Sequence, residues 1–156
     1  MWAPSLIMFW YDYIRTITKI LLIYLGLNEY KLVDTRNRCA TVSYKSLRSS
    51  SLHMSNKCDA FILTPDFHLK HAKTGLCVEP TSWYGNYRNW EKLFLSGNCA
   101  GQASVFIPIG EYILHAASGK YLDQSYGNIM RISPTPRTKL KLETSKFQNW
   151  RFQRQC

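Results

Sequence analysis

The chain has 156 residues, a length typical of one domain, and it is strongly basic, with 20 Lys and Arg residues against ten Asp and Glu residues. Its composition, 46% hydrophobic and 19% charged, excludes a wholly disordered chain, because it provides enough apolar side chains for a core. The net charge of +10 favours polyanionic partners, namely nucleic acid, sulfated glycans or acidic membrane surfaces, and equally suits a solvated face.

Residues 1–29 form an apolar N-terminal segment that differs from the rest of the chain. Its two apolar runs flank Asp12, Arg15 and Lys19, and neither reaches the roughly 18 residues needed to span a bilayer. The second run follows two cations, as in a signal peptide, but no small-x-small cleavage site follows it. We therefore predict no spanning segment. The residues form a signal-like segment, a short amphipathic helix, or sequence extraneous to the domain.

A repeated pattern begins at Tyr30. Residues 67–79 and 111–123 match at an offset of 44, with His over His, Thr over Ser, Gly over Gly and acid over acid. A fainter copy covers residues 30–39, where Asn37 takes the place of the glycine. Because Gly and Asn tolerate a positive φ, each copy predicts a hairpin with a turn at this position.

Alternating apolar residues predict two further strands in each copy. The predicted third strands are Leu52-His53-Met54, Leu93-Phe94-Leu95 and Leu140-Lys141-Leu142. The predicted fourth strands are Phe61-Ile62-Leu63, Val105-Phe106-Ile107 and Trp150-Arg151-Phe152. The chain therefore divides into units of about 30–66, 67–110 and 111–156, each with about four short strands. This spacing predicts one closed all-β domain over residues 30–156.

The five cysteines have no Cys-x-x-Cys pair, so the common zinc-binding spacings are absent. The interval from Cys39 to Cys58 is 19 residues and that from Cys77 to Cys99 is 22 residues. Two loops of similar length suggest two disulfides, each worth on the order of 3 kcal/mol and typical of an oxidising compartment. Four buried thiols are the alternative, and Cys156 is left over.

The order of these features resembles the ricin B-type lectin domain, which is a β-trefoil. Its elements are a strand, a turn with glycine, Cys-Val-acid, a strand ending near a second Cys, and Gln-x-Trp. Gln148-Asn149-Trp150 matches the last element, and Gln102-Ala103-Ser104 is its degenerate counterpart 46 residues earlier. The resemblance covers residues 30–156 and implies a β-trefoil of three four-stranded repeats, preceded by an N-terminal segment that can be helical. It also implies disulfides Cys39–Cys58 and Cys77–Cys99, with Tyr121 replacing the first cysteine of the third unit.

In such lectins an acid after Cys-Val accepts hydrogen bonds from sugar hydroxyls, and an aromatic ring stacks on the sugar. The resemblance implies a sugar site in the second unit, at Glu79 with Trp83 or Trp90. It implies another in the third unit, formed by Asp123, Tyr126, Asn128, Gln148 and Asn149. The first unit has Thr41 at the acid position and is not expected to bind.

Two departures from the family weaken these sites. Gly101 and Phe147 stand where the family has Asn before the Gln, and Gly97 replaces the aromatic residue expected before the second Cys. The second unit instead has an aromatic-rich loop over residues 83–90, with four aromatic residues. This loop is a sugar platform, a protein-contact patch or a small hydrophobic cluster.

Three cations in the third unit form a second candidate site. Arg137, Lys139 and Lys141 alternate with leucines, so they share one face of a predicted strand. This arrangement suits sulfate or phosphate groups, with an affinity that falls as salt rises. A solvated strand face is the alternative.

The sequence contains no motif for catalysis. His71 and His115 are equivalent residues of the repeat, which favours a structural role. G-x-S-x-G, H-E-x-x-H and P-loop patterns are absent, so we predict no enzyme, no metal and no cofactor.

We predict a secreted or extracellular lectin-like module that binds galactose-type or related glycans through one or two units. Its expected partners are soluble or protein-linked glycans, anionic glycans among them, and not nucleic acid. The alternatives are a trefoil that binds sulfated glycans or a protein receptor, and a degenerate structural or adhesion module.

Overall fold

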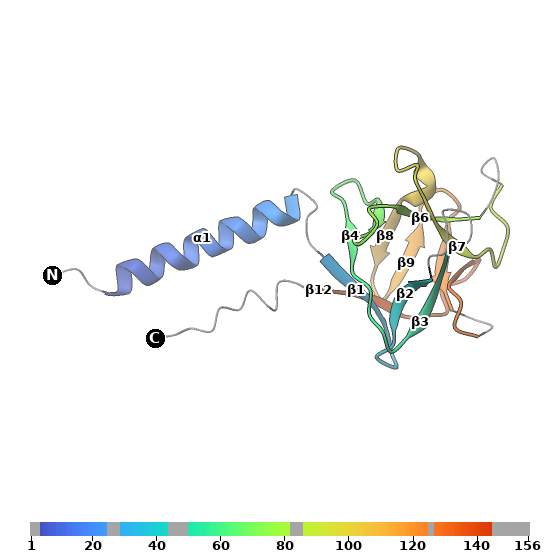
Figure 1. Cartoon of the computed structure of the whole chain (residues 1–156), viewed down its shortest axis with the longest axis horizontal. Helices are drawn as coiled ribbons and strands as arrows, with labels where there is room; N and C mark the ends of the chain where they lie inside the picture. The colour runs from blue at the N-terminus through green and yellow to red at the C-terminus, as the bar shows by residue number, and fades with distance from the viewer. Residues whose placement is uncertain (1–3, 25–28, 44–49, 82–85, 125–126, 145–156) are drawn as a thin grey trace.

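The computed structural model describes residues 4–24, 29–43, 50–81, 86–124 and 127–144. A helix, α1 (Pro4–Tyr24), precedes a β-domain, and Figure 1 shows this helix extending away from the domain. The prediction that the N-terminal segment can be helical is therefore confirmed. Within the described residues, no helix combines the length and apolarity needed to cross a membrane.

The β-domain consists of three consecutive groups of four short strands. The first unit contains β1 (Glu29–Asp34), β2 (Cys39–Ser43), β3 (Ser51–Ser55) and β4 (Phe61–Leu63). The second contains β5 (Leu69–His71), β6 (Cys77–Pro80), β7 (Leu93–Ser96) and β8 (Phe106–Ile109), with a 3-10 turn, η1 (Gln102–Ser104), before β8. The third contains β9 (Tyr112–His115), β10 (Lys120–Asp123), β11 (Arg131–Ser133) and β12 (Leu140–Thr144). The predicted all-β class is confirmed.

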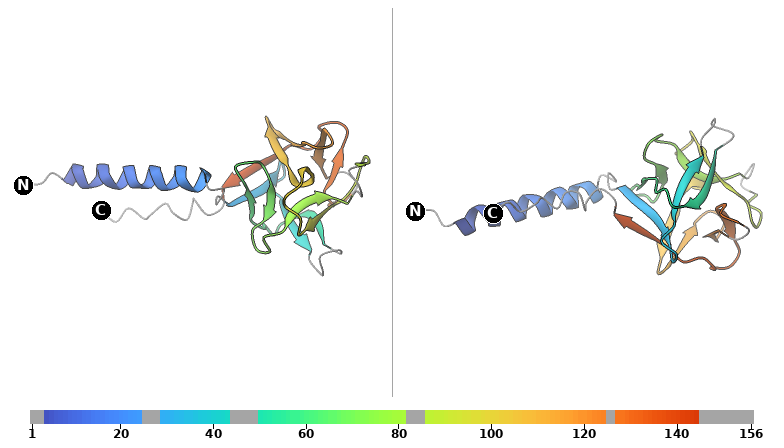
Figure 2. Two further views of the ribbon diagram at one scale, coloured as in Figure 1. Left: turned by 90° about the horizontal axis from the view of Figure 1, so that it is seen from above. Right: turned by 60° about the horizontal axis from the view of Figure 1, so that its bottom comes forward.

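Strand pairing follows the same rule in each unit. The second and third strands pair as β2–β3, β6–β7 and β10–β11, all antiparallel. The fourth strand pairs with the first strand of the next unit, as β4–β5 and β8–β9, and β12–β1 closes the ring. Figure 2 shows β1 and β12 side by side at the end of the domain from which α1 extends.

The ring closure defines which residues are equivalent in the three units. Phe61 lies opposite His71, Phe106 opposite His115, and Leu140 opposite Asp34. Asp34 therefore occupies, in the first unit, the position held by His71 and His115 in the other two.

The prediction for the third strand of the third unit is wrong. The third strand is β11, whereas Leu140-Lys141-Leu142, predicted as the third strand, forms part of the fourth strand β12. Because Leu140 takes the place of Phe106, the residues equivalent to Gln102-Ala103-Ser104 are Pro136-Arg137-Thr138. Gln148-Asn149-Trp150, predicted as that counterpart, follows β12 in the sequence. That triplet and the predicted strand over residues 150–152 lie outside the described residues.

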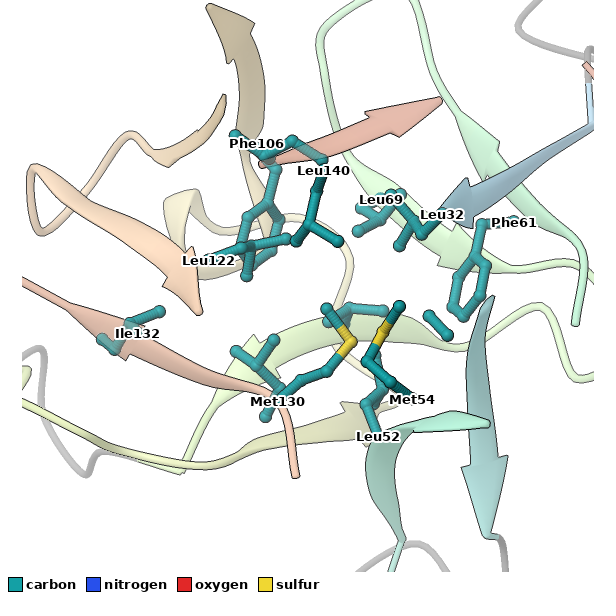
Figure 3. Close-up of a cluster of buried hydrophobic side chains, with 14 of the residues drawn as sticks. Leu32, Leu52, Met54, Phe61, Leu69, Phe106, Leu122, Met130, Ile132 and Leu140 are labelled. Carbon is teal, nitrogen blue, oxygen red and sulfur yellow. The ribbon is translucent and has the colours of Figure 1, made fainter. Parts of the chain in front are cut away.

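All three units contribute to one central core, shown in Figure 3. Strands β3, β5, β7 and β9 bury alternate residues, as in β3, where Leu52 and Met54 point inward and His53 is only partly buried. Full burial of one large apolar side chain is worth about 1.5–3 kcal/mol. The largest fully buried apolar side chains are Leu32, Leu52, Met54, Phe61, Leu69, Leu93, Leu95, Phe106, Leu122, Met130 and Ile132.

The predicted turns and disulfides are confirmed. Asn37 has φ 60°, and the equivalent Gly75 and Gly119 have φ 70° and 69°, as expected for a turn that favours Gly or Asn. Disulfides join Cys39 to Cys58 and Cys77 to Cys99, with Cα atoms 4.8 and 5.5 Å apart. Cys156 lies outside the described residues.

Candidate ligand-binding site

An open depression of about 630 Å³ lies where the third unit meets the first, and we call it the basic depression. Its walls come from the β1–β2 turn of the first unit and from two loops of the third unit, after β10 and before β12. The lining residues are Thr35, Arg36, Arg38, Gln124, Gly127, Asn128, Arg137, Thr138 and Lys139. Four of the nine are cationic, and none is acidic or aromatic.

Arg38 is held at this junction by hydrogen bonds to both units. Its Nε donates to Asp34 Oδ2 at 3.1 Å, its Nη1 to Asn128 Oδ1 at 2.6 Å and its Nη2 to Gln124 Oε1 at 3.1 Å. The Gln124 amide also donates to Asp34 Oδ2 at 2.9 Å. This network fixes the side chains of Gln124 and Asn128 before any ligand binds.

Asp34 is the buried anchor of the network, with 1% of its side chain exposed. Burial alone would raise the pKa of this carboxyl. Hydrogen bonds from the backbone N–H of Arg38, the Gln124 amide, the backbone N–H of Arg36 and the Arg38 guanidinium outweigh burial and lower the pKa below its usual value. Asp34 is therefore ionised at neutral pH and neutralises part of the charge of Arg38.

Asp123, the predicted sugar-binding acid of the third unit, is buried beneath the basic depression rather than exposed in it. Only 1% of Asp123 is exposed. Its Oδ1 accepts a hydrogen bond from Thr138 Oγ1 at 2.7 Å, and that same hydroxyl accepts from the backbone N–H of Gln124 at 3.3 Å. Asp123 thus fixes the start of β12 against β10.

The first unit makes the same contacts as the third unit, but the acid and the hydroxyl exchange places. Thr41, equivalent to Asp123, donates to Asp59 Oδ1 at 2.9 Å, and Asp59, equivalent to Thr138, accepts from the backbone N–H of Val42 at 3.0 Å. Both units therefore pair an acid with a hydroxyl, one on the second strand and one in the loop before the fourth strand, in opposite order. This exchange explains why the first unit has no acid after its Cys, and it assigns Asp123 a packing role.

Trp90 and Arg137, which the sequence placed in two different candidate sites, are in contact. The Arg137 guanidinium carbon lies 5.5 Å from the centroid of the Trp90 ring, a cation–π distance. The Trp90 backbone N–H donates to Ile132 O at 2.8 Å, and its carbonyl accepts from Arg131 Nη1 at 2.9 Å. Trp90 therefore packs against the third unit and supports one wall of the basic depression.

The cations of the basic depression differ in how they are neutralised. Arg38 pairs with Asp34, and Lys139 pairs with the exposed Glu111 at 3.0 Å, which raises the pKa of Lys139. Among the described residues, Arg36 and Arg137 have no carboxylate within ion-pair distance. Two exposed guanidinium groups therefore keep their full charge at the rim.

Lys141, the third predicted anion-binding residue, lies outside the basic depression. It lines a neighbouring hollow of about 340 Å³ that shares Thr35 and Lys139 with the basic depression. Its Nζ lies 2.9 Å from Glu143 Oε1, and both side chains are exposed. The structure thus brings Arg137 and Lys139 together and places Lys141 beside them with its own carboxylate.

An equivalent depression of about 430 Å³ lies between the first and second units, and we call it the neutral depression. Cys58, Asp59 and Ala60 take the places of Arg137, Thr138 and Lys139. Ala72 and Lys73 take the places of Thr35 and Arg36. Its full lining is Glu29, Cys58, Asp59, Ala60, His71, Ala72 and Lys73. One cation therefore stands here against two acids.

The predicted site at Glu79 is not gathered into any of these three hollows. Glu79 is half-buried on β6, and its pKa is raised by burial, although a hydrogen bond with Ser96 opposes the shift. Tyr87, from the aromatic-rich loop, packs on the core with its ring edge-on to His115 at 4.9 Å. The described part of this loop therefore fits the hydrophobic-cluster alternative. Trp83 lies outside the described residues, as do Tyr126, Gln148 and Asn149.

Sequence reasoning missed six of the nine lining residues of the basic depression: Thr35, Arg36, Arg38, Gln124, Gly127 and Thr138. Arg38 is 90 residues before its partner Asn128, so no local motif joins them. One signal was present, because Arg36 and Arg38 flank the turn residue Asn37, whereas Thr74 and Leu76 flank Gly75 in the second unit.

Asp66, His68 and Ser104 are arranged in the order of a catalytic triad, but they do not form an active site. His68 Nδ1 lies 2.6 Å from Ser104 Oγ, and its Nε2 lies 3.3 Å from Asp66 Oδ2. Ser104 is completely buried, so its hydroxyl cannot reach a substrate. In the part of the chain that the structure describes, no group of three or more His, Cys, Asp or Glu side chains could hold a metal ion.

His71 and His115 have the structural role predicted for them. Each ring Nδ1 lies within hydrogen-bond distance of a turn hydroxyl, at 2.9 Å from Thr74 and at 2.7 Å from Ser118. Burial lowers the pKa of His115, although its bond to the Ala103 carbonyl opposes the shift. His115 is therefore a neutral core residue.

Comparison with known proteins supports the fold. The β-domain is similar to an agglutinin from Abrus precatorius, with 12% sequence identity and a TM-score of 0.59 over 74% of this chain and 48% of that one. It is also similar to the protein in a PSL1a–E64 complex, with 11% identity and a TM-score of 0.61 over 75% of this chain and 47% of that one. A third similar structure is the designed threefold-symmetric protein ThreeFoil, with 14% identity and a TM-score of 0.58 over 75% of this chain and 99% of that one. The chain spans about half the length of the first two. No family model and no curated protein matches the sequence.

At these identities the likenesses establish the fold alone. The predicted β-trefoil is confirmed, since ThreeFoil is matched over almost its whole length. The resemblance to the ricin B-type lectin domain, first noted on sparse sequence motifs, also holds at the level of three-dimensional structure. The chain is therefore a β-trefoil, similar in fold to ricin B-type lectins.

Proposed function

We propose that this chain is a non-enzymatic carbohydrate-binding module that binds glycans in the basic depression. The similarity of its β-trefoil to ricin B-type lectins favours glycan binding as a class. The observation that carries the proposal is the fixed pair of amides from Gln124 and Asn128, both oriented by Arg38 within an open hollow. Its volume of about 630 Å³ is in the range of small-ligand pockets.

The amides and the arginine suit sugar hydroxyls. Asn and Gln carry both donors and acceptors, and a hydroxyl can donate to one and accept from another. Because Arg38 already orders both amides, a ligand does not have to immobilise them, and preorganisation of this kind reduces the entropy cost of binding. A polar hollow lined by amides, hydroxyls and cations suits ligand recognition.

The two disulfides support an extracellular location for this activity. Disulfides persist in oxidising environments such as the outside of the cell. A secreted trefoil would meet glycans on cell surfaces and on soluble glycoproteins, which are the partners we propose.

The test is a glycan array probed with the intact chain and with two matched variants. Asn128→Ala removes one amide of the basic depression, and we expect it to weaken binding of any retained glycan by about tenfold. Asn56→Ala removes an exposed amide outside all three hollows and should leave binding unchanged. Binding that survives Asn128→Ala at full strength would place the site elsewhere, and no binding by the intact chain would refute the function.

Asp123→Ala is a poor test of the same idea. Asp123 is buried and holds Thr138, so its loss would destabilise β12 whether or not a sugar binds. The exposed Asn128 reports on the ligand with less effect on folding.

A further inference from the structure

We propose that the ligand of the basic depression is an acidic saccharide, and that Arg36, Arg137 and Lys139 bind its sulfate or carboxylate group. This inference rests on the proposed function and adds the class of sugar. Its first support is charge. Four cations line one hollow, and among the described residues only Arg38 and Lys139 of these have a carboxylate partner.

The second support is the comparison of two hollows within one fold. The neutral depression lies at the equivalent position of the backbone, but Lys73 is the one cation among its lining residues. Two acids, Asp59 and Glu29, line it as well. Packing therefore does not require four cations at this position, because an equivalent hollow forms with only one. The four cations are a property of one junction and suit a ligand bound there.

The third support is the way in which the guanidinium groups are held. Arg137 rests on the Trp90 ring at 5.5 Å, which orients the group without neutralising its charge. Arg38 donates hydrogen bonds to Asp34, Gln124 and Asn128, and Asp34 neutralises part of its charge, so it shapes the hollow and contributes less net charge. Arginine is suited to paired hydrogen bonds with planar or tetrahedral oxyanions.

The chemistry of the walls favours a saccharide over nucleic acid. Single-stranded nucleic acid is held by aromatic rings that stack on the bases, and none of the nine lining residues is aromatic. Amide and hydroxyl groups from Gln124, Asn128 and Thr35 surround the cations instead, and these are groups that bind sugar hydroxyls. An acidic sugar would use both kinds of group at once.

The experiment measures the affinity of the intact chain for oligosaccharides of one length. The probes are sulfated chondroitin fragments, the same fragments after desulfation, which retain their carboxylates, and neutral galactose-type oligosaccharides. We expect at least one acidic series to bind about tenfold or more tightly than the neutral series. Preference between the first two probes identifies the acidic group as sulfate or carboxylate.

Variants then locate the charge. Arg137→Gln and Arg36→Gln should each weaken binding of the preferred acidic probe by about tenfold and leave any neutral binding unchanged. Lys73→Gln, the matched change in the neutral depression, should have no effect. Thermal unfolding of each variant checks that the exposed substitutions leave the fold intact.

The remaining outcomes separate this inference from the proposed function. Equal affinity for acidic and neutral probes, with both lost in Asn128→Ala, would refute the acidic ligand and keep the lectin. Tight binding of single-stranded DNA that exceeds every saccharide would refute the inference, as would binding of inorganic sulfate alone. No saccharide binding at all would refute both.

Discussion

The two equivalent depressions of this trefoil differ in chemistry although they share a backbone frame. At the neutral depression, Asp59 bonds Thr41 and His71, and the disulfide at Cys58 forms one wall. At the basic depression, Thr138 bonds Asp123, and Arg137 stands where Cys58 would be. The buried contact of acid with hydroxyl is kept in both, whereas the rim residues change. The repeat thus conserves packing and leaves the rim available for ligand specificity.

The largest expected effect comes from removing the disulfide of the neutral depression. Replacing Cys39 and Cys58 together with Ala opens a 19-residue loop, and the loop-entropy argument gives a loss of about 3 kcal/mol in unfolding free energy. Denaturant unfolding of the variant measures this loss. Binding to the acidic probe, measured where the variant remains folded, should persist because Cys58 does not line the basic depression.

A loss well under 1 kcal/mol would contradict the idea that the disulfide holds this junction. Loss of binding in a folded variant would contradict the independence of the two depressions. The comparison is the variant in which Cys77 and Cys99 of the second unit are both replaced with Ala.

Exchanging the acid and the hydroxyl at the basic depression tests whether the two junctions are interchangeable. Asp123→Thr and Thr138→Asp should each cost about 2 kcal/mol, the first by removing an acceptor and the second by placing two carboxylates together. The double variant recreates the Thr41–Asp59 order of the first unit. We expect it to recover at least about 1 kcal/mol relative to the sum of the single changes.

Urea unfolding of the parent, the two single variants and the double variant gives the coupling energy between residues 123 and 138. Simple additivity would show that the equivalence seen in the hydrogen bonds has no energetic counterpart. Tyr121→Phe, a change on β10 outside this contact, provides the control for general disturbance of the strand.

A smaller, pH-dependent effect distinguishes Asp34 from its equivalents His71 and His115. The pKa of Asp34 is lowered in the fold, so its ionised form stabilises the protein. That contribution is complete above about pH 4, the ordinary value for Asp, and is lost as pH falls through the lower folded pKa. We expect Asp34→Asn to be less stable than the parent at pH 7, with a difference that shrinks below about pH 4.

Unfolding free energies of parent and variant at several pH values test this sign. Asp59, whose pKa is also lowered, is present in both proteins, so its contribution cancels in the difference. A difference that stays constant or grows in acid would show that the ionised Asp34 is not the stabilising form.

The sequence predicted the strands correctly in the units that carry a recognisable turn residue and a pair of cysteines. The glycine or asparagine turn and the cysteine pair mark the first two units, because only a few residue types satisfy a positive φ or form a disulfide. The third unit lacks the cysteines. Leu140-Lys141-Leu142 therefore resembled the Leu-x-Met of β3 and the Leu-x-Leu of β7, and Arg131-Ile132-Ser133 was missed between polar and proline-rich loops.

The candidate site was less predictable for a different reason. Arg137 and Lys139 were identified because cations alternate with leucines along a predicted strand, which is a local pattern, although both residues lie in the loop before β12. Arg36 and Arg38 reach the same hollow only because β12 pairs with β1, a contact between the two ends of the repeat. Asp123 was assigned to sugar by family analogy, whereas its burial follows from the packing of β10 on Thr138.

The smallest expected effect concerns Glu111, the carboxylate that pairs with Lys139 at the rim of the basic depression. Both side chains are exposed, at 68% and 50%, so the pair contributes little to folding. Glu111→Gln should therefore leave the midpoint of thermal unfolding unchanged. It should also make Lys139 available to a ligand and tighten binding of the acidic probe roughly two- to fivefold.

The matched control is Glu143→Gln, which removes the carboxylate beside Lys141 in the neighbouring hollow. If the ligand occupies the basic depression alone, this variant should bind as the parent does. If the two variants tighten binding equally, the effect is one of net charge, and the acidic group is then not held at Lys139. A gain confined to Glu111→Gln places the anionic group within reach of Lys139, on the rim that distinguishes the basic depression from its neutral equivalent.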